Sequence, residues 1–170
     1  DLTIQDIGYT QQAALVGGKV DAVVGYSNND AIQIRQAGTP VRTIQVADRI
    51  PLVGVSLVTT RSLLDSRRQD LETVVKASIK GMTAFVKDPD AAVEATKDHM
   101  DDLKVDQTQA ARAREVAVAT GKLVSGDGSH PIGSVRVDDI ASMIEFLTSH
   151  KLLGDKKTPK AAEVCVPLAQ

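Results

Sequence analysis

The chain has 170 residues, of which 42% are hydrophobic, and its formal net charge is −2. This length suggests one domain or two small pieces, and the absence of a Lys/Arg-rich stripe argues against a nucleic-acid partner. No apolar run approaches the roughly 18 residues of a membrane span. Cys165 is the only cysteine, which excludes an internal disulfide and a cysteine-based metal site.

The first 46 residues alternate between patterns typical of strands and of helices. The predicted strands are 2–7, 20–25 and 41–46, and the predicted helices are 11–16 and about 28–37. Residues 20–25 form a near-continuous apolar run, as expected for a parallel strand covered on both faces. This βαβαβ order predicts right-handed crossovers and a parallel sheet, and therefore an α/β fold with parallel-rich sheets flanked by helices.

Residues 47–54 interrupt this order, because Pro51 lacks a backbone donor and Asp48 and Arg49 are polar. We interpret this segment as a crossover between two lobes, with a strand over 55–60 after it. The alternative is an ordinary turn before an edge strand.

From Ser62 onward the sequence predicts helices. Apolar residues recur at helical spacing over 71–86, and Asp88-Pro89 ends that helix. Further helices are expected from about Asp90 to His99, over 108–120 and over 138–150. We also expect a Gly/Ser/Pro loop at 123–135 and an irregular tail at 156–170.

A candidate small-molecule site follows the apolar run 20–25. Ligands of α/β folds bind beyond the carboxyl ends of strands, where hydrogen-bonding side chains gather. The candidate ligand-binding residues are Tyr9, Gly25, Tyr26, Asn28, Asn29 and Asp30. The alternative is structural: Asn28 or Asn29 caps the next helix, Asp30 favours its dipole, and Tyr9 fills the core.

Other chemistry-bearing residues favour no catalytic or metal site. Asp127, Ser129 and His130 are too close in sequence to form a catalytic triad readily, and a triad would also need a positioned oxyanion hole. The three histidines lack the spacing of metal ligands, and Gly17-Gly18 lacks the pattern of a phosphate loop. We therefore expect no catalytic residue, no metal and no cofactor.

Several motifs in order resemble one family. They are ALVGGKVDAVVGYSNNDAIQIRQAG, then VADRIPLVGVSLVTT, then ASIKGMTAFVKDPDAAVEA. Together they resemble the NMT1/THI5-like substrate-binding proteins of ABC transporters, which are similar in fold to sulfonate- and nitrate-binding proteins. In that family a GY-x-N-x-E element ends a strand, and Gly25, Tyr26, Asn28 and Asp30 take its place here.

The resemblance implies a type II periplasmic-binding-protein fold with a cleft between two lobes that close about a hinge. It assigns residues 1–47 to the end of the second lobe, 48–54 to the crossover and 55–170 to a mostly helical return to the first lobe. A whole member is roughly twice this length, and the chain does not begin as a native start would. We therefore expect only the C-terminal part here, completed by a missing N-terminal half or by a second copy.

The resemblance also implies an extracytoplasmic protein, periplasmic or lipid-anchored, that captures a small heteroaromatic nutrient such as a thiamine pyrimidine or a flavin for an ABC permease. Aminopyrimidine-binding members tend to carry Trp and Glu where this chain has Ser27 and Asp30. One alternative is an effector-binding sensor domain of the same fold. Another is a pyrimidine synthase like the fungal relatives, which the lack of a cysteine-rich motif disfavours.

Overall fold

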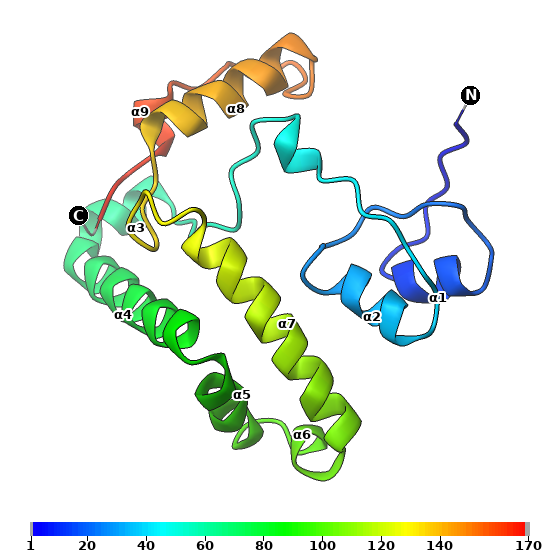
Figure 1. Ribbon diagram of the computed structural model, residues 1–170. Coiled ribbons are helices and arrows are strands. Elements are labelled where there is room, and N and C mark those ends of the chain that lie inside the picture. Colours follow the sequence, from blue (N-terminus) through cyan, green and yellow to red (C-terminus); the bar gives the residue numbers. More distant parts are fainter. Residues whose placement is uncertain (1, 169–170) are drawn as a thin grey trace. The chain divides into compact units, whose positions relative to one another are not determined.

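The computed structural model describes residues 2–168, and every regular element within that range is a helix (Figure 1). The helices are α1 (Gln11–Val16), α2 (Asp30–Gln36), the 3-10 helix η1 (Val46–Asp48), α3 (Arg61–Ser66), α4 (Arg68–Lys87), α5 (Pro89–Lys97), α6 (Asp102–Val105), α7 (Gln107–Ser125), α8 (Val137–Ser149) and α9 (Ala161–Val164).

The predicted α/β fold with parallel-rich sheets, and with it the sheet architecture of a periplasmic-binding-protein fold, is wrong for residues 2–168. The segments predicted as strands, 2–7, 20–25, 41–46 and 55–60, do not pair with one another: the first precedes α1, and the other three lie mainly in the connections between helices. A strand is completed only by hydrogen bonds to a neighbouring strand. Apolar alternation along one segment favours an extended backbone, but it does not supply that neighbour.

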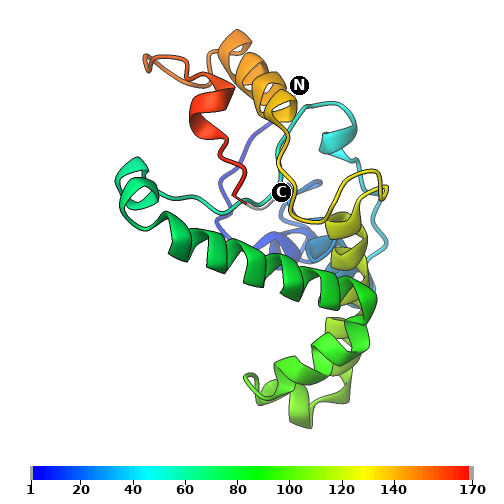
Figure 2. The same ribbon diagram turned by 90° about the vertical axis from the view of Figure 1, so that its left-hand side faces the viewer.

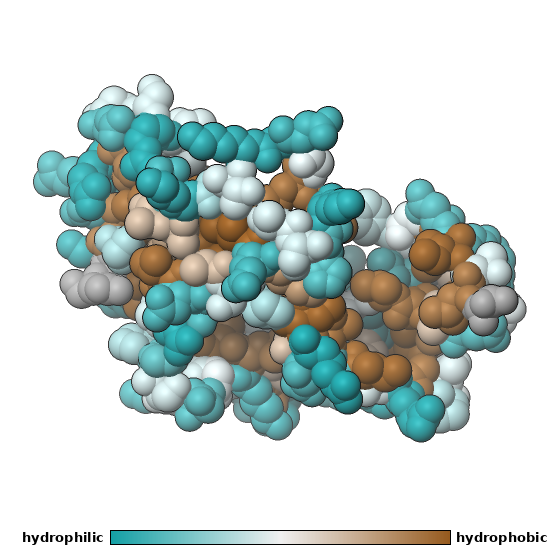
Figure 3. All heavy atoms as spheres, turned by 90° about the horizontal axis from the view of Figure 1, so that it is seen from above, coloured by the Kyte–Doolittle hydropathy of each residue, from teal (hydrophilic) through white to brown (hydrophobic). Residues whose placement is uncertain are grey.

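The apolar side chains of these unpaired segments lie open to solvent. Leu2, Ile4, Val24, Ile44 and Val55 are between 85% and 98% exposed. The accessible area of the chain is 13073 Å². Two separate globules of half its mass would expose only about 9,700 Å² together. Figure 3 shows brown, apolar side chains at the surface among the teal, polar ones.

Glycines follow the two short helices of the first segment, α1 and α2. After α1, Gly18 takes a φ of +65° and Lys19 N donates to Ala14 O. After α2, Gly38 takes a φ of +84° and Thr39 N donates to Ile34 O. Both are six-to-one hydrogen bonds that satisfy carbonyl groups at the helix end. They require one residue in the left-handed backbone conformation, which glycine adopts without strain.

The long helices confirm the predictions from helical spacing. Between α4 and α5, the Asp88 side chain accepts a hydrogen bond from Ala91 N at 2.9 Å, and Pro89 occupies the first turn, where a missing N–H costs nothing. α7 is longer than the predicted 108–120, and α8 differs from the predicted 138–150 by one residue at each end. The short helices η1, α6 and α9 were not predicted.

The chain divides into two compact units. In the described range, unit 1 comprises residues 2–44 and 88–123, and unit 2 comprises residues 45–87 and 124–168. The buried apolar residues of unit 1 are Ala14, Ile32, Ile34, Leu103 and Ala117, and those of unit 2 are Leu64 and Cys165. α1 packs on α2 in unit 1 (Figure 1), and α9, in red, packs on α8, in orange, in unit 2 (Figure 2).

The assignment of residues 1–47, 48–54 and 55–170 to lobes and a crossover stays a prediction. Within residues 2–168, none of the helices combines the length and the apolar character that crossing a membrane requires.

Candidate functional site

The candidate site is a closed turn between the apolar run 20–25 and helix α2, in unit 1. Asp30 N donates to Tyr26 O at 2.8 Å, and Tyr26 N donates to Asp30 Oδ2 at 2.6 Å. These reciprocal bonds join the two ends of the turn. Asp30 therefore has a structural task, because one of its carboxylate oxygens satisfies a backbone donor that precedes the helix.

Gly25 is required by that turn for space. A Cβ atom at this position would lie 2.7 Å from Asp30 Oδ2 and 3.0 Å from its Cβ and Cγ atoms. Any larger residue would displace the carboxylate from the Tyr26 N–H. The backbone at Gly25 is therefore crowded by Asp30.

The two asparagines of the turn have partners other than the helix N-terminus. Asn29 precedes α2 but makes no side-chain capping bond, and its Oδ1 accepts from Gln33 Nε2 at 2.7 Å. Asn28 is half-buried, and its Nδ2 donates to Thr120 Oγ1 at 2.8 Å. The structural alternative, in which an asparagine side chain caps α2, is thus not what this structure adopts.

The two tyrosines lie at the surface. The Tyr26 side chain is 70% exposed and Tyr9 is fully exposed, so neither fills the core. Exposed aromatic rings are available to stack on a flat ligand. Tyr9 stands apart from the hydrogen bonds of the turn, which join Tyr26, Asn28 and Asp30 to their partners.

Residues of α7 contact the site region, and sequence reasoning missed them. Besides Thr120, Arg112 Nε donates to Gln36 Oε1 at 2.9 Å, and Gln36 Nε2 donates to the Glu115 carboxylate. These bonds tie the start and the end of α2 to α7. The buried residues of α7, Ala117 and Gly121, lie in the same part of that helix. No local pattern indicates such partners, because Thr120 is 92 positions from Asn28.

Two shallow hollows lie in unit 2 rather than at the turn. One has a volume of about 430 Å³ and is lined mainly by α8 and by residues 158–161. The other has a volume of about 310 Å³ and lies at the turn that follows α8. The first hollow is mainly apolar, and neither contains a candidate ligand residue.

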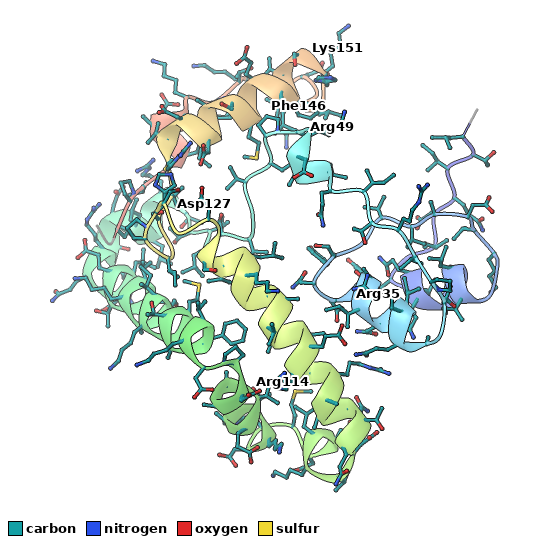
Figure 4. The ribbon with its side chains drawn as sticks, in the orientation of Figure 1. Arg35, Arg49, Arg114, Asp127, Phe146 and Lys151 are labelled. Atoms are coloured by element: carbon teal, nitrogen blue, oxygen red, sulfur yellow. The ribbon has the colours of Figure 1, made fainter. Side chains whose placement is uncertain are left out.

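Asp127 lies in the loop after α7 (Figure 4), and this loop forms no catalytic triad. Ser129 donates both its hydroxyl, at 2.5 Å, and its backbone N–H, at 2.9 Å, to Asp127 Oδ1. These bonds lower the pKa of the Asp127 carboxyl, the hydroxyl contributing most. His130 instead contacts Arg136. A serine that donates to the acid directly has no base to activate it, so this loop is a surface turn.

Comparisons with known proteins place the candidate residues within a matched region. A profile described as NMT1/THI5 like matches residues 1–92, which include all six candidate ligand residues. The riboflavin-binding protein RibY of Chloroflexus aurantiacus is 31% identical over 94 residues, which are 55% of this chain and 27% of that protein. No solved structure matches the chain.

A second relative is the formylaminopyrimidine-binding protein of Halalkalibacterium halodurans, which is 22% identical over 153 residues, 88% of this chain and 46% of that protein. The chain thus spans less than half the length of either relative. Both relatives are named as binding proteins rather than enzymes, in agreement with the prediction of a binding protein. Because the NMT1/THI5-like profile matches more than half of the sequence, the chain belongs to the NMT1/THI5-like family.

Proposed function

We propose that this chain is part of an extracytoplasmic solute-binding protein that captures a small heteroaromatic nutrient and delivers it to an ABC permease. The observation that carries the proposal is that the family match, at residues 1–92, contains the whole turn Tyr26–Asp30. The names of both relatives support a small-molecule ligand.

The ligand class that we propose is flavin-like or pyrimidine-like. Tyr26 presents an exposed ring, and Asn28 and Asn29 present amides, so the turn offers a stacking surface beside hydrogen-bonding groups. A flat ring with N–H and C=O groups on its edge is complementary to that combination. Riboflavin is the first ligand to test, because the flavin-binding relative has the higher identity over its match.

A further polypeptide segment completes this protein. Several large apolar side chains of the segments 2–7, 20–25, 41–46 and 55–60 are exposed, and the total accessible area of the chain exceeds that expected for folded globules of its mass. The relatives are more than twice as long as the region that they share with this chain. We propose that additional residues of the same protein, or a second copy of the chain, cover these segments.

The test is ligand binding by the protein produced at its full genomic length. Native mass spectrometry would look for a retained small molecule, and calorimetry would then measure binding of riboflavin and of formylaminopyrimidine. The proposal predicts saturable one-to-one binding of one of them. Binding of neither ligand, with no small molecule retained after purification, would contradict it.

A further inference from the structure

We propose that Thr120 is a positioning residue for ligand recognition: it orients the Asn28 amide so that Asn28 Oδ1 accepts a hydrogen bond from an N–H group on the edge of the ligand. This inference rests on the proposed function and deepens it, because it specifies which chemical group the ligand must present.

The Asn28–Thr120 hydrogen bond differs from the other polar contacts between α7 and the α2 region. It is half-buried, whereas the bonds of Gln36 with Arg112 and Glu115 are exposed. Exposed polar pairs contribute little, because water competes for both partners, while a partly buried bond is better protected. Thr120 is therefore the contact on α7 best suited to hold a side chain of the turn in one orientation.

The partner of Thr120 is also unusual among the hydroxyl residues of these helices. Thr73, Thr83, Thr96 and Thr148 each donate to the carbonyl four residues earlier in their own helix. That arrangement is the ordinary way in which a helical threonine satisfies its hydroxyl. Thr120 Oγ1 instead accepts a bond from a residue 92 positions away, at 2.8 Å.

The geometry of an amide gives this bond a chemical consequence. The Asn28 Nδ2 group donates to Thr120, and a side-chain amide carries its acceptor, Oδ1, on the opposite branch. Fixing the donor end on α7 therefore fixes where the acceptor end points. Because Oδ1 cannot donate, it favours a ligand edge that offers an N–H over one that offers only a carbonyl or a methyl group.

Riboflavin and N3-methylriboflavin test this directly, since they differ at one ring N–H. The wild-type protein is expected to bind riboflavin more tightly than the methylated analogue. Thr120→Val removes the hydroxyl at nearly constant shape, and we expect it to weaken riboflavin binding about three- to tenfold, the value of one hydrogen bond. It should weaken N3-methylriboflavin binding much less, so that discrimination between the two flavins falls.

Three further variants control the experiment. Thr120→Ser keeps the hydroxyl and should restore the discrimination. Thr96→Val makes the same change on α5, at a threonine that bonds within its own helix, and should leave both affinities unchanged. In an Asn28→Ala background, Thr120→Val should have no further effect on discrimination, because the group that it orients is gone.

The outcomes separate this inference from the proposed function. If Thr120→Val lowers both affinities by the same factor, or leaves both unchanged while the wild type binds riboflavin, the positioning role is wrong and the binding function stands. If the wild-type protein binds no riboflavin, the flavin assignment fails and this inference fails with it. Circular dichroism of each variant confirms that the helices are intact.

Discussion

Two regions of the molecule differ in where their backbone N–H and carbonyl groups can find hydrogen-bond partners. One region is the helices between residues 61 and 149, and the other is the apolar segments between residues 2 and 60. Each helix bonds carbonyls and N–H groups that are four residues apart. Local side chains also cap some of the helix N-termini, as Thr60 does for α3 and Asp88 does for α5. The segments 2–7 and 55–60 need partners from elsewhere in the polypeptide, and within residues 2–168 they find none. Helices can thus form in a chain that leaves extended segments uncovered.

The largest predicted effect concerns those uncovered segments in the 170-residue chain by itself. Trypsin should cleave first after Arg42 and Arg49, which are exposed and lie outside the α-helices, and about tenfold more slowly after Lys76 and Lys80 within α4. Mass spectrometry of the earliest fragments identifies the sites.

The control for this prediction is the protein at full genomic length, in which cleavage after Arg42 should slow markedly if a further segment covers residues 41–46. First cuts within α4, or equal rates at Arg42 in both proteins, would contradict the account of the exposed segments.

The next effect concerns Asp30, where an extended segment meets a helix. Asp30→Ala removes the acceptor of the Tyr26 N–H and opens the turn, so we expect ligand binding to weaken by about 1–3 kcal/mol. Isothermal titration calorimetry of the full-length protein measures the change.

Asp21→Ala is the matched control, because it removes the same charge at an exposed position within residues 20–25 that makes no hydrogen bond to the turn. Equal affinities for the wild type, Asp21→Ala and Asp30→Ala would show that the turn does not shape the ligand site.

A smaller effect tests the helical region by itself. Asp88→Ala removes the side-chain cap from the Ala91 N–H and should destabilise the chain by about 1 kcal/mol, seen as a lower urea midpoint. Asp98→Ala, at the other end of α5, removes an equal charge without removing this cap. Should both variants unfold at the same urea concentration, the capping bond contributes nothing.

The smallest effect is a change in the titration of Asp127. Because hydrogen bonds from Ser129 favour its ionised form, the pKa of Asp127 lies below its ordinary value. Any stabilisation from these bonds is present above the unfolded-state pKa and is lost as the pH falls through the folded-state pKa. Ser129→Ala should raise the Asp127 pKa towards its ordinary value, measured by carboxyl NMR, whereas Ser134→Ala in the same loop should not.

The comparison also explains what could be predicted from the sequence. Helix α1 was predicted at its observed bounds, and α5 was predicted to begin near Asp90, because spacing, capping residues and glycines act within a few positions. The predicted sheet does not form within residues 2–168, because strand pairing depends on residues far away in the sequence, which local patterns do not identify. The turn Tyr26–Asp30 follows from local chemistry, but its link to Thr120 depends on how unit 1 packs.

Hydrogen exchange with and without riboflavin tests the central claim most directly, in the full-length protein. If the turn after the apolar run 20–25 holds the ligand, the amides of residues 25–30 should exchange more slowly in the presence of riboflavin, and the Asn28→Ala variant should lose that protection. Riboflavin binding that protects other segments and leaves residues 25–30 unchanged would contradict the claim.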